Sequence, residues 1–300
     1  MTEERKQEIL EIIRNTNRRP AQTGKPLYPE EIMAYPNLCE EIESISRTVD
    51  GFSYRMDILR AKNRGENCPL FINIHGGGFI GPHRENDTYF SAYMANQIHG
   101  ITVDLDYTLS DAAPYPVALH QCMDALDYVA EHANTWSASA KDISVGGYSA
   151  GGALTAAMGI CCAERGGFVP KLQILCYPPL EYRIPDQYKI DAYDRQIGME
   201  RCKAFADLYF DDKKENFEDI HNSPLYAPRE ILAKQPKTLI LSAGLCNFRY
   251  EDEDYAICLA DAGVEVILKR FPEASHGFIP HFMDGWKEAA DLMVREILEK

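Results

Sequence analysis

A serine between two glycines is the residue in this chain best suited to act as a nucleophile. Ser149 lies in the segment 147–151, which reads Gly-Tyr-Ser-Ala-Gly and fits the pattern G-x-S-x-G. The stretch 143–148 before it predicts a strand, and the small-residue stretch 150–164 after it predicts a helix. Because the glycines leave room for a sharp strand-to-helix turn, the hydroxyl is expected at the carboxyl end of a sheet, next to a helix N-terminus. This context predicts acyl-transfer chemistry at Ser149.

A glycine triplet follows another predicted strand and is suited to bind negative charge. Residues 75–79 read His-Gly-Gly-Gly-Phe, directly after the apolar stretch 70–75. Glycines leave their backbone N–H groups unobstructed, so that several can point at one oxygen. We predict that the amides of Gly77, Gly78 and Ala150 form an oxyanion hole for a tetrahedral intermediate. His75 is interpreted as a brace of this loop.

A base for the serine is expected at the same end of the sheet. His276 lies in the segment 274–278, Ala-Ser-His-Gly-Phe, which follows the last predicted strand. The order of a serine followed later by a histidine suits a serine hydrolase of this arrangement. We therefore predict that His276 is the base. The other histidines lack this placement and are interpreted as surface or core residues; besides His75 they stand at positions 83, 99, 120, 132, 221 and 281.

The elements that must position these residues alternate along the chain. Strands are predicted over 54–60, 70–75, 101–106, 143–148, 172–177, 238–243 and 264–271. Helices are predicted over 3–18, 116–132, 150–164 and 251–262, and from about 286 to the end. Alternation of this kind predicts a mostly parallel sheet flanked by helices. The length of 300 residues favours a single domain over the whole chain.

One stretch departs from the alternation and predicts a cap. Residues 182–225 are rich in tyrosine, phenylalanine and charge, and they are too many for an ordinary connection between two strands. The N-terminal stretch 3–18 has apolar residues on one side of a charged helix, so it needs a partner surface. We expect cap elements from about 1–45 and 182–225 to cover the carboxyl ends of the strands.

Composition and charge narrow the class of partner. The 46 acidic and 31 basic side chains give a net charge of −15, which disfavours nucleic acid and anionic membrane surfaces as partners. No apolar run is long enough to span a bilayer, and the nine cysteines are odd in number and sit mostly in apolar segments. We expect a cytoplasmic protein with reduced thiols and no bound metal. The composition is compatible with a homo-oligomer.

Three motifs together resemble a known family. The segments HGGGF, GYSAGG and SHGF, with Tyr-Pro at 177–178, resemble the hormone-sensitive-lipase-like esterases of the α/β-hydrolase fold, over roughly residues 70–290. The resemblance implies an eight-stranded sheet with a helical cap. It also implies hydrolysis of small, short-acyl esters without a cofactor.

The same resemblance exposes a departure at the third member of the catalytic triad. Aligning Arg249, Glu251 and Tyr255 with the family's acid segment puts Cys246 where the aspartate is expected. A neutral thiol is a poor acceptor for an imidazole proton. Two carboxylates are candidate substitutes: Glu181, just past the preceding predicted strand, and Asp252, inside the predicted helix.

Two function classes follow from this departure. The intact serine, histidine and glycine loop favour an esterase, which without any acid would be slowed on the order of 10⁴-fold. The cysteine favours the alternative, a weakly active or non-catalytic protein that binds a small molecule on a hydrolase scaffold.

Overall fold

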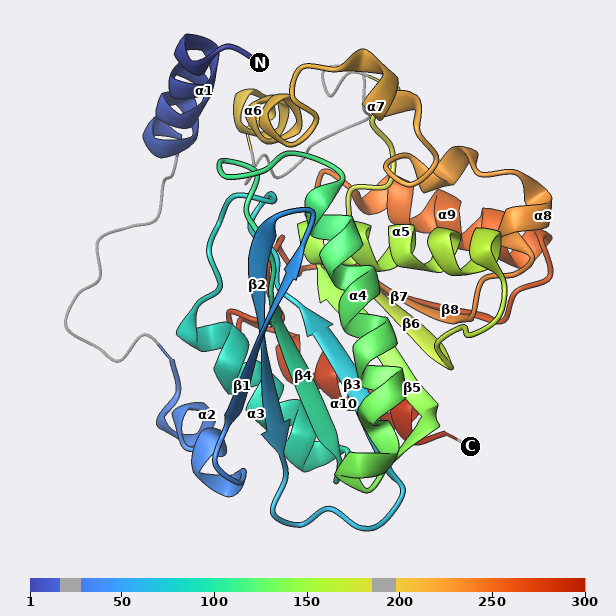
Figure 1. Cartoon of the computed structure of the whole chain (residues 1–300). Helices are drawn as coiled ribbons and strands as arrows, with labels where there is room; N and C mark the ends of the chain where they lie inside the picture. Colours follow the sequence, from blue (N-terminus) through green and yellow to red (C-terminus); the bar gives the residue numbers. More distant parts are fainter. Residues whose placement is uncertain (17–27, 185–197, 300) are drawn as a thin grey trace.

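The structure is built on one eight-stranded sheet with helices on both faces (Figure 1). This computed structural model describes residues 1–16, 28–184 and 198–299. Across the sheet the order is β1-β2-β4-β3-β5-β6-β7-β8. Strand β2 pairs antiparallel with β1 and β4, and the remaining pairs are parallel, which confirms the predicted architecture. The bounds are β1 Glu43–Val49, β2 Phe52–Arg60, β3 Cys68–Ile74, β4 Ile101–Asp106, β5 Ala138–Tyr148, β6 Leu172–Cys176, β7 Lys237–Ala243 and β8 Val266–Phe271.

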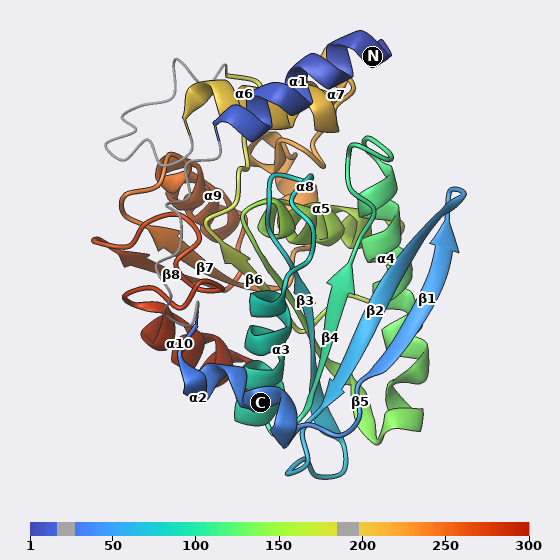
Figure 2. The same cartoon turned by 90° about the vertical axis from the view of Figure 1, so that its left-hand side faces the viewer.

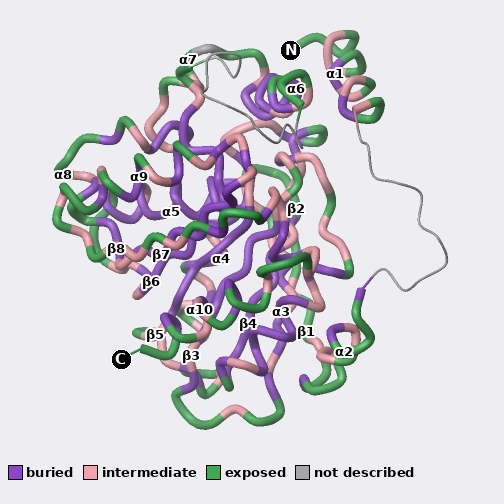
Figure 3. The backbone as a smooth tube through the Cα atoms, turned by 180° about the vertical axis from the view of Figure 1, so that it is seen from behind, coloured by how far each residue is buried: buried purple, intermediate pink, exposed green. Residues whose placement is uncertain are grey.

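Helices cover the sheet because its strands carry apolar side chains on both faces. One face packs against α4 (Val117–His132), α5 (Ala150–Arg165) and α9 (Arg249–Asp261). The other face packs against α3 (Glu85–Gln97) and α10 (Trp286–Leu298). The interior of the molecule lies between these layers (Figure 3). The shorter described helices are α2 Glu30–Met33, η1 Tyr35–Leu38, η2 Ala133–Trp136, α7 Lys214–Glu218, η4 Pro224–Tyr226 and α8 Arg229–Leu232.

Besides short helices, strand β1 of the sheet and helix α3, which packs on it, were not predicted from the sequence. Strand β1 is an edge strand with no fully buried residue, so its sequence lacks the apolar alternation that marks a strand. Helix α3 has the opposite property. Most of its residues are buried on several sides, which removes the one-sided apolar pattern on which helix prediction depends.

The N-terminal helix packs against a helix that is nearly 200 residues away in the sequence. Helices α1 (Glu3–Asn15) and α6 (Met199–Tyr209) lie side by side beyond the carboxyl ends of the parallel strands (Figures 1 and 2). Buried Ile9 and Ile13 of α1 contact Ala204 and Leu208 of α6. The amphipathic face predicted for the N-terminal helix has therefore found its partner surface in α6.

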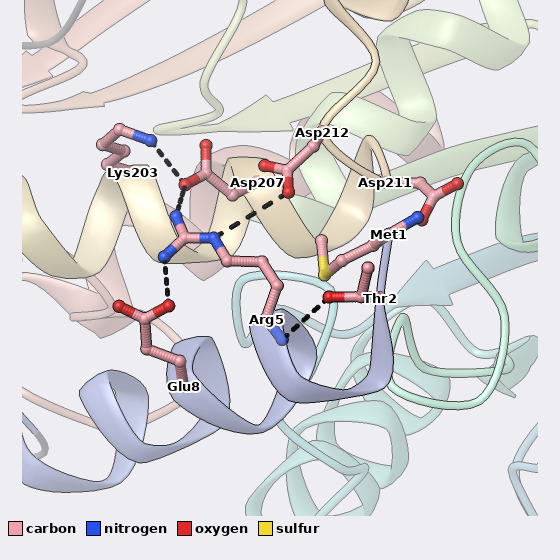
Figure 4. A network of polar contacts seen from close by, with 8 residues as sticks. All are labelled: Met1, Thr2, Arg5, Glu8, Lys203, Asp207, Asp211 and Asp212. Atoms are coloured by element: carbon pink, nitrogen blue, oxygen red, sulfur yellow. Dashed lines mark hydrogen bonds and ion pairs between the residues drawn. The ribbon is translucent and has the colours of Figure 1, made fainter.

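Ion pairs at the rim add to this contact (Figure 4). Arg5 lies 3.1 Å from Asp207 of α6 and 2.8 Å from Glu8 of its own helix. The amino group of Met1 lies 2.6 Å from Asp211, just past the end of α6. Exposed pairs of this kind contribute little stability one by one, so the apolar contact is the main link between the two helices.

The rest of the N-terminal stretch lies elsewhere in the molecule. Helices α2 and η1 pack against α3, at the opposite end from α1 (Figure 1). Ile32 is buried there, and the ring of Tyr35 makes an edge contact with that of Tyr93. Of the described residues in the segment 1–45 that was expected to belong to a cap, only those of α1 lie beside α6.

Candidate active site

The serine motif forms a sharp turn that only glycine permits at its flanks. Ser149 has φ 54° and ψ −119°, between the last residue of β5 and the first residue of α5. A Cβ at Gly147 would lie 2.4 Å from the backbone of Gly151, and one at Gly151 would lie 2.1 Å from the carbonyl oxygen of Ile74. A non-glycine residue in this φ region is strained, and such strain is typical of functional turns. The turn presents a partly exposed hydroxyl at the end of the sheet.

The glycine triplet lies against this turn. A Cβ at Gly76 would come within 2.7 Å of the Tyr148 carbonyl oxygen. Gly77 and Gly78 have φ values of +124° and +63°, which other residues rarely adopt. The structure thus brings the segment with the amides of Gly77 and Gly78 next to the N-terminus of α5, where the amide of Ala150 begins the helix.

A residue that the sequence analysis did not single out lies over the triplet. A Cβ at Gly78 would come within 2.5 Å of the ring of Phe205 on α6. The ring of Tyr209, one helical turn further along α6, stacks on Phe79 with centroids 3.7 Å apart. The aromatic content of 182–225 indicated a cap but not which rings would reach the loop, because that depends on how α6 docks.

Ser149, His276 and Cys246 form one hydrogen-bonded line. Nε2 of His276 lies 2.8 Å from Oγ of Ser149, and Nδ1 lies 3.0 Å from Sγ of Cys246. His276 is in the loop after β8, and Cys246 is in the turn between β7 and α9. Adjacent parallel strands therefore deliver the two side chains to the same end of the sheet. Within the described residues, these two side chains are the hydrogen-bond partners of the imidazole.

Both members of the His276–Cys246 contact are held neutral. The imidazole lies between the rings of Tyr177 and Phe248, and although part of the residue reaches solvent, burial lowers its pKa to about 3. Burial also raises the pKa of the Cys246 thiol well above its usual value, with a further contribution from the charge of Asp252. In the tautomer needed for catalysis, Ser149 donates to Nε2 and Nδ1–H donates to a thiol sulfur, which is a weak acceptor.

The two candidate substitute acids do not contact His276. Oε1 of Glu181 accepts a hydrogen bond of 2.8 Å from the backbone of Ile184 and so closes its own turn. Asp252 is fully buried in the first turn of α9, and neither carboxyl oxygen has a hydrogen-bond partner in the described part of the chain. The structure therefore places Cys246, rather than Glu181 or Asp252, against the second imidazole nitrogen.

A small pocket begins one turn beyond Ser149 on α5. Ala153 and Ala157 form its wall along the helix, and Tyr182 and Tyr209 contribute aromatic walls. Phe79, Leu154, His221 and Asn222 complete the lining. Tyr182 belongs to the aromatic-rich stretch 182–225 that predicted a cap, and Tyr188 and Tyr193 of the same stretch lie outside the described residues.

The described residues contain neither a metal-binding cluster nor a membrane-spanning helix. In residues 1–16, 28–184 and 198–299, no group of three or more potential metal ligands is close enough to hold an ion. No helix in those same ranges is both long and apolar enough to cross a bilayer. All nine cysteines are free thiols.

The depressed pKa of His276 leads to a prediction about acid pH. A group with a pKa near 3 stays neutral, and able to accept a proton, far below the usual histidine range. We expect kcat/KM for an ester to change little between pH 7 and pH 5, with the acid limb of the profile below pH 5. A limb centred near pH 6.5, measured where circular dichroism shows a folded protein, would contradict this prediction.

The chain is similar in sequence to known hydrolases and esterases. A family model described as alpha/beta hydrolase fold matches residues 71–280. Esterase LipI of Mycobacterium tuberculosis is 30% identical over 217 residues, which cover 71% of this chain and 66% of that protein. Hormone-sensitive lipase of Bos taurus is 28% identical over 120 residues, 40% of this chain and 16% of the lipase. The chain thus spans only part of these relatives.

Solved structures show the same fold. A Pyrobaculum calidifontis esterase superposes with a TM-score of 0.81 at 24% identity, covering 98% of this chain and 92% of that one. At this identity the match speaks for the architecture and not for the substrate.

Proposed function

Since the chain belongs to the α/β-hydrolase family, among the relatives of hormone-sensitive lipase, we propose that it is a serine carboxylesterase that hydrolyses short-acyl esters through an acyl-enzyme. The observation that carries this proposal is the 2.8 Å contact between Ser149 Oγ and His276 Nε2 at a strained turn beside a glycine loop. Strand β5, helix α5 and the loop after β8 must all be correctly placed for that contact to exist.

The chemistry follows from the placement of these groups. Oγ of Ser149 attacks the ester carbonyl carbon while its proton passes to Nε2 of His276. The negative oxygen of the tetrahedral intermediate accepts hydrogen bonds from the amides of Gly77, Gly78 and Ala150. When the intermediate collapses, the alcohol leaves with the proton from Nε2, and a water molecule then hydrolyses the acyl-enzyme by the same steps.

Cys246 makes this a slow variant of the mechanism. The imidazolium that forms during attack faces a neutral sulfur in place of a carboxylate, so it receives little electrostatic stabilisation. An imidazole with a low pKa is also a weak base. We expect a real but modest turnover number for good substrates.

The pocket beyond Ser149 supports a preference for short acyl groups. Its lining includes Tyr182 and Tyr209 as well as His221 and Asn222, and along α5 it extends from Ala153 to Ala157, about one helical turn. Helix α6 carries Tyr209 of this lining and packs against α1, and we propose that these two helices form the cap over this region. We expect a long acyl chain to meet the rings of Tyr182 and Tyr209 along this wall.

A panel of nitrophenyl esters from acetate to dodecanoate tests the substrate class. We expect the highest kcat/KM at about two to four acyl carbons and a steep fall at longer chains, because the rings of Tyr182 and Tyr209 line the pocket. Ala157→Leu, which fills the pocket wall, serves as the matched variant and should lower turnover of butyrate more than that of acetate. Faster turnover of dodecanoate than of acetate would contradict the proposal.

The second candidate function is binding without turnover, and Cys246 is the observation that favours it. In that case the protein would retain a small ester unchanged. Mass spectrometry of the panel after prolonged incubation decides between the two, because an esterase releases the alcohol and a binding protein does not.

A further inference from the structure

A buried ion pair lies directly behind the glycine loop and has no part in the chemistry described so far. Nε2 of His83 lies 2.7 Å from Oδ2 of Asp104, and the side chains are 9% and 0% exposed. Asp104 is on β4, whereas His83 is in the segment that leads from the glycine triplet to α3. Removing a charged pair from water has a large desolvation cost, so a buried pair of this kind indicates a structural or functional role.

The sheet holds Asp104 from the side opposite His83. Asn73 on β3 pairs with Asp104 in the parallel register, and its Nδ2 donates 3.2 Å to Oδ1 of Asp104. The same nitrogen lies 3.0 Å from the hydroxyl of Ser91 on α3. Asn73 on the sheet therefore fixes the position of the carboxylate, and the carboxylate in turn holds the ring of His83.

Residues 77–83, which run from the glycine triplet to His83, form a compact segment. The amide of Gly81 donates 2.7 Å to the carbonyl of Gly77, and a Cβ at Gly77 would lie 2.9 Å from Gly81. The carbonyl of Phe79 accepts from both the amide and the hydroxyl of Ser110, at 2.9 Å and 3.0 Å. A shift at His83 would therefore be passed on to Gly77 and Gly78.

His75, at the other end of the loop, contacts the imidazole of His83. The imidazoles of His75 and His83 meet edge to face with centroids 5.7 Å apart, and His75 stacks on Tyr107 at 4.3 Å. Nδ1 of His75 lies 2.7 Å from the carbonyl of Gly76. The His83 imidazolium stands at the end of this loop and also contacts His75 at its beginning.

We propose that the His83–Asp104 pair positions the oxyanion loop, holding the amides of Gly77 and Gly78 toward the charge that develops above Ser149. This inference rests on the proposed esterase function. His83 touches no reacting atom in this scheme, so it is a positioning residue. Its loss acts on the transition state more than on the bound substrate, because the oxyanion exists only in the former.

The charge state of the pair links the loop to alkaline pH. Burial by itself lowers the pKa of His83, but the charge and hydrogen bond of Asp104 outweigh it and raise the pKa to about 9. The other titratable or charged groups around the pair are Asp87, whose pKa burial raises to about 7, Asp106, Arg84 and neutral His75. Because the folded-state pKa exceeds the unfolded one, the pair contributes fully below about pH 6.5 and is lost as the pH rises through about 9.

The test compares His83→Gln, Asp104→Asn and the double variant with the full-length protein on a short-chain nitrophenyl ester. We expect kcat to fall about tenfold or more in each single variant, a fraction of the 10²–10³ that a deleted oxyanion donor costs, with KM changed less than threefold. The affinity of a trifluoromethyl ketone, which forms an oxyanion on Ser149, should fall in parallel with kcat. His83→Gln keeps a neutral donor, so it remains informative if Asp104→Asn fails to fold.

A matched pair elsewhere separates positioning from mere stability. Arg47 and Asp124 join β1 to α4 through two hydrogen bonds of 2.6 Å and 2.8 Å, far from the glycine loop. Asp124→Asn should lower the melting temperature and leave kcat within twofold. In addition, we expect kcat of the native protein to decline as the pH rises through about 9, and this decline should be absent from His83→Gln.

Equal kcat values in His83→Gln and the native protein, or ketone affinities that do not change, would overturn the inference. Failure of the proposed function has a different signature. In that case the native protein itself would turn over no ester and bind no ketone.

Discussion

Replacing Ser149 with alanine should abolish labelling by a fluorophosphonate and remove ester turnover. The size of the loss follows from the triad. Removing the serine from an intact triad costs about 10⁶ in kcat, and lacking the acid already costs about 10⁴, so the native enzyme should exceed the alanine variant by at least about 10²-fold. Labelling is all or none, because the reagent forms its bond with Oγ. Both effects are measured by active-site titration and by initial rates with nitrophenyl acetate.

A serine on β5, the strand that leads to Ser149, provides the control. Ser139 lies near the beginning of β5, at the opposite end from Ser149, and accepts a hydrogen bond from the amide of Lys141. Ser139→Ala should keep its full label and rate. Ester turnover in Ser149→Ala equal to that of this control would remove Ser149 from the mechanism.

Replacing Cys246 with aspartate should raise kcat by a factor of ten or more. Sγ of Cys246 lies 3.0 Å from Nδ1 of His276, so a carboxylate built at this position faces the nitrogen that must hold its proton. The gain is a conservative part of the roughly 10⁴ that triads lose when the acid is removed. The carboxylate acts by fixing the productive tautomer and by stabilising the imidazolium.

The pH profile gives this variant a second, independent readout. An adjacent negative charge favours the imidazolium, so the pKa of His276 should rise from its depressed value. Activity of Cys246→Asp should therefore increase at pH 8 while its acid limb moves to higher pH than in the native protein. Cys246→Asn, with the same shape and no charge, should show neither change.

The two other carboxylates set the limits of this prediction. Asp252 is buried near position 246, and burial raises the pKa of its carboxyl. Two neighbouring carboxylates disfavour each other's ionisation, so Asp252 should oppose the negative charge of a new aspartate at position 246. Asp252→Asn added to Cys246→Asp should then increase the gain. Glu181→Gln should leave kcat nearly unchanged, because Glu181 closes its own turn with Ile184. A steep loss in Glu181→Gln, with no effect of Cys246→Asp, would instead make Glu181 the acid.

Prediction from the sequence succeeded where a residue's role depends on its neighbours in the chain. The strand, glycine and helix around Ser149 are contiguous, so the turn was predictable from local sterics. The same holds for the parallel sheet, whose buried strands read as apolar runs. Strand β1 and helix α3 escaped prediction because one is an exposed edge and the other is enclosed on several sides, so neither shows a one-sided apolar pattern.

The sequence by itself determined the serine turn, the glycine triplet, the strand that ends before His276 and the absence of an aspartate at position 246. Only the tertiary structure decided which side chain meets the second nitrogen of His276, because three separate segments were candidates and only the turn after β7 lies beside the loop after β8. It also decided that Phe205 covers Gly78 and that His83 pairs with Asp104. Such contacts join residues from distant parts of the chain, and their geometry is set by how whole helices and strands pack, which no local pattern records.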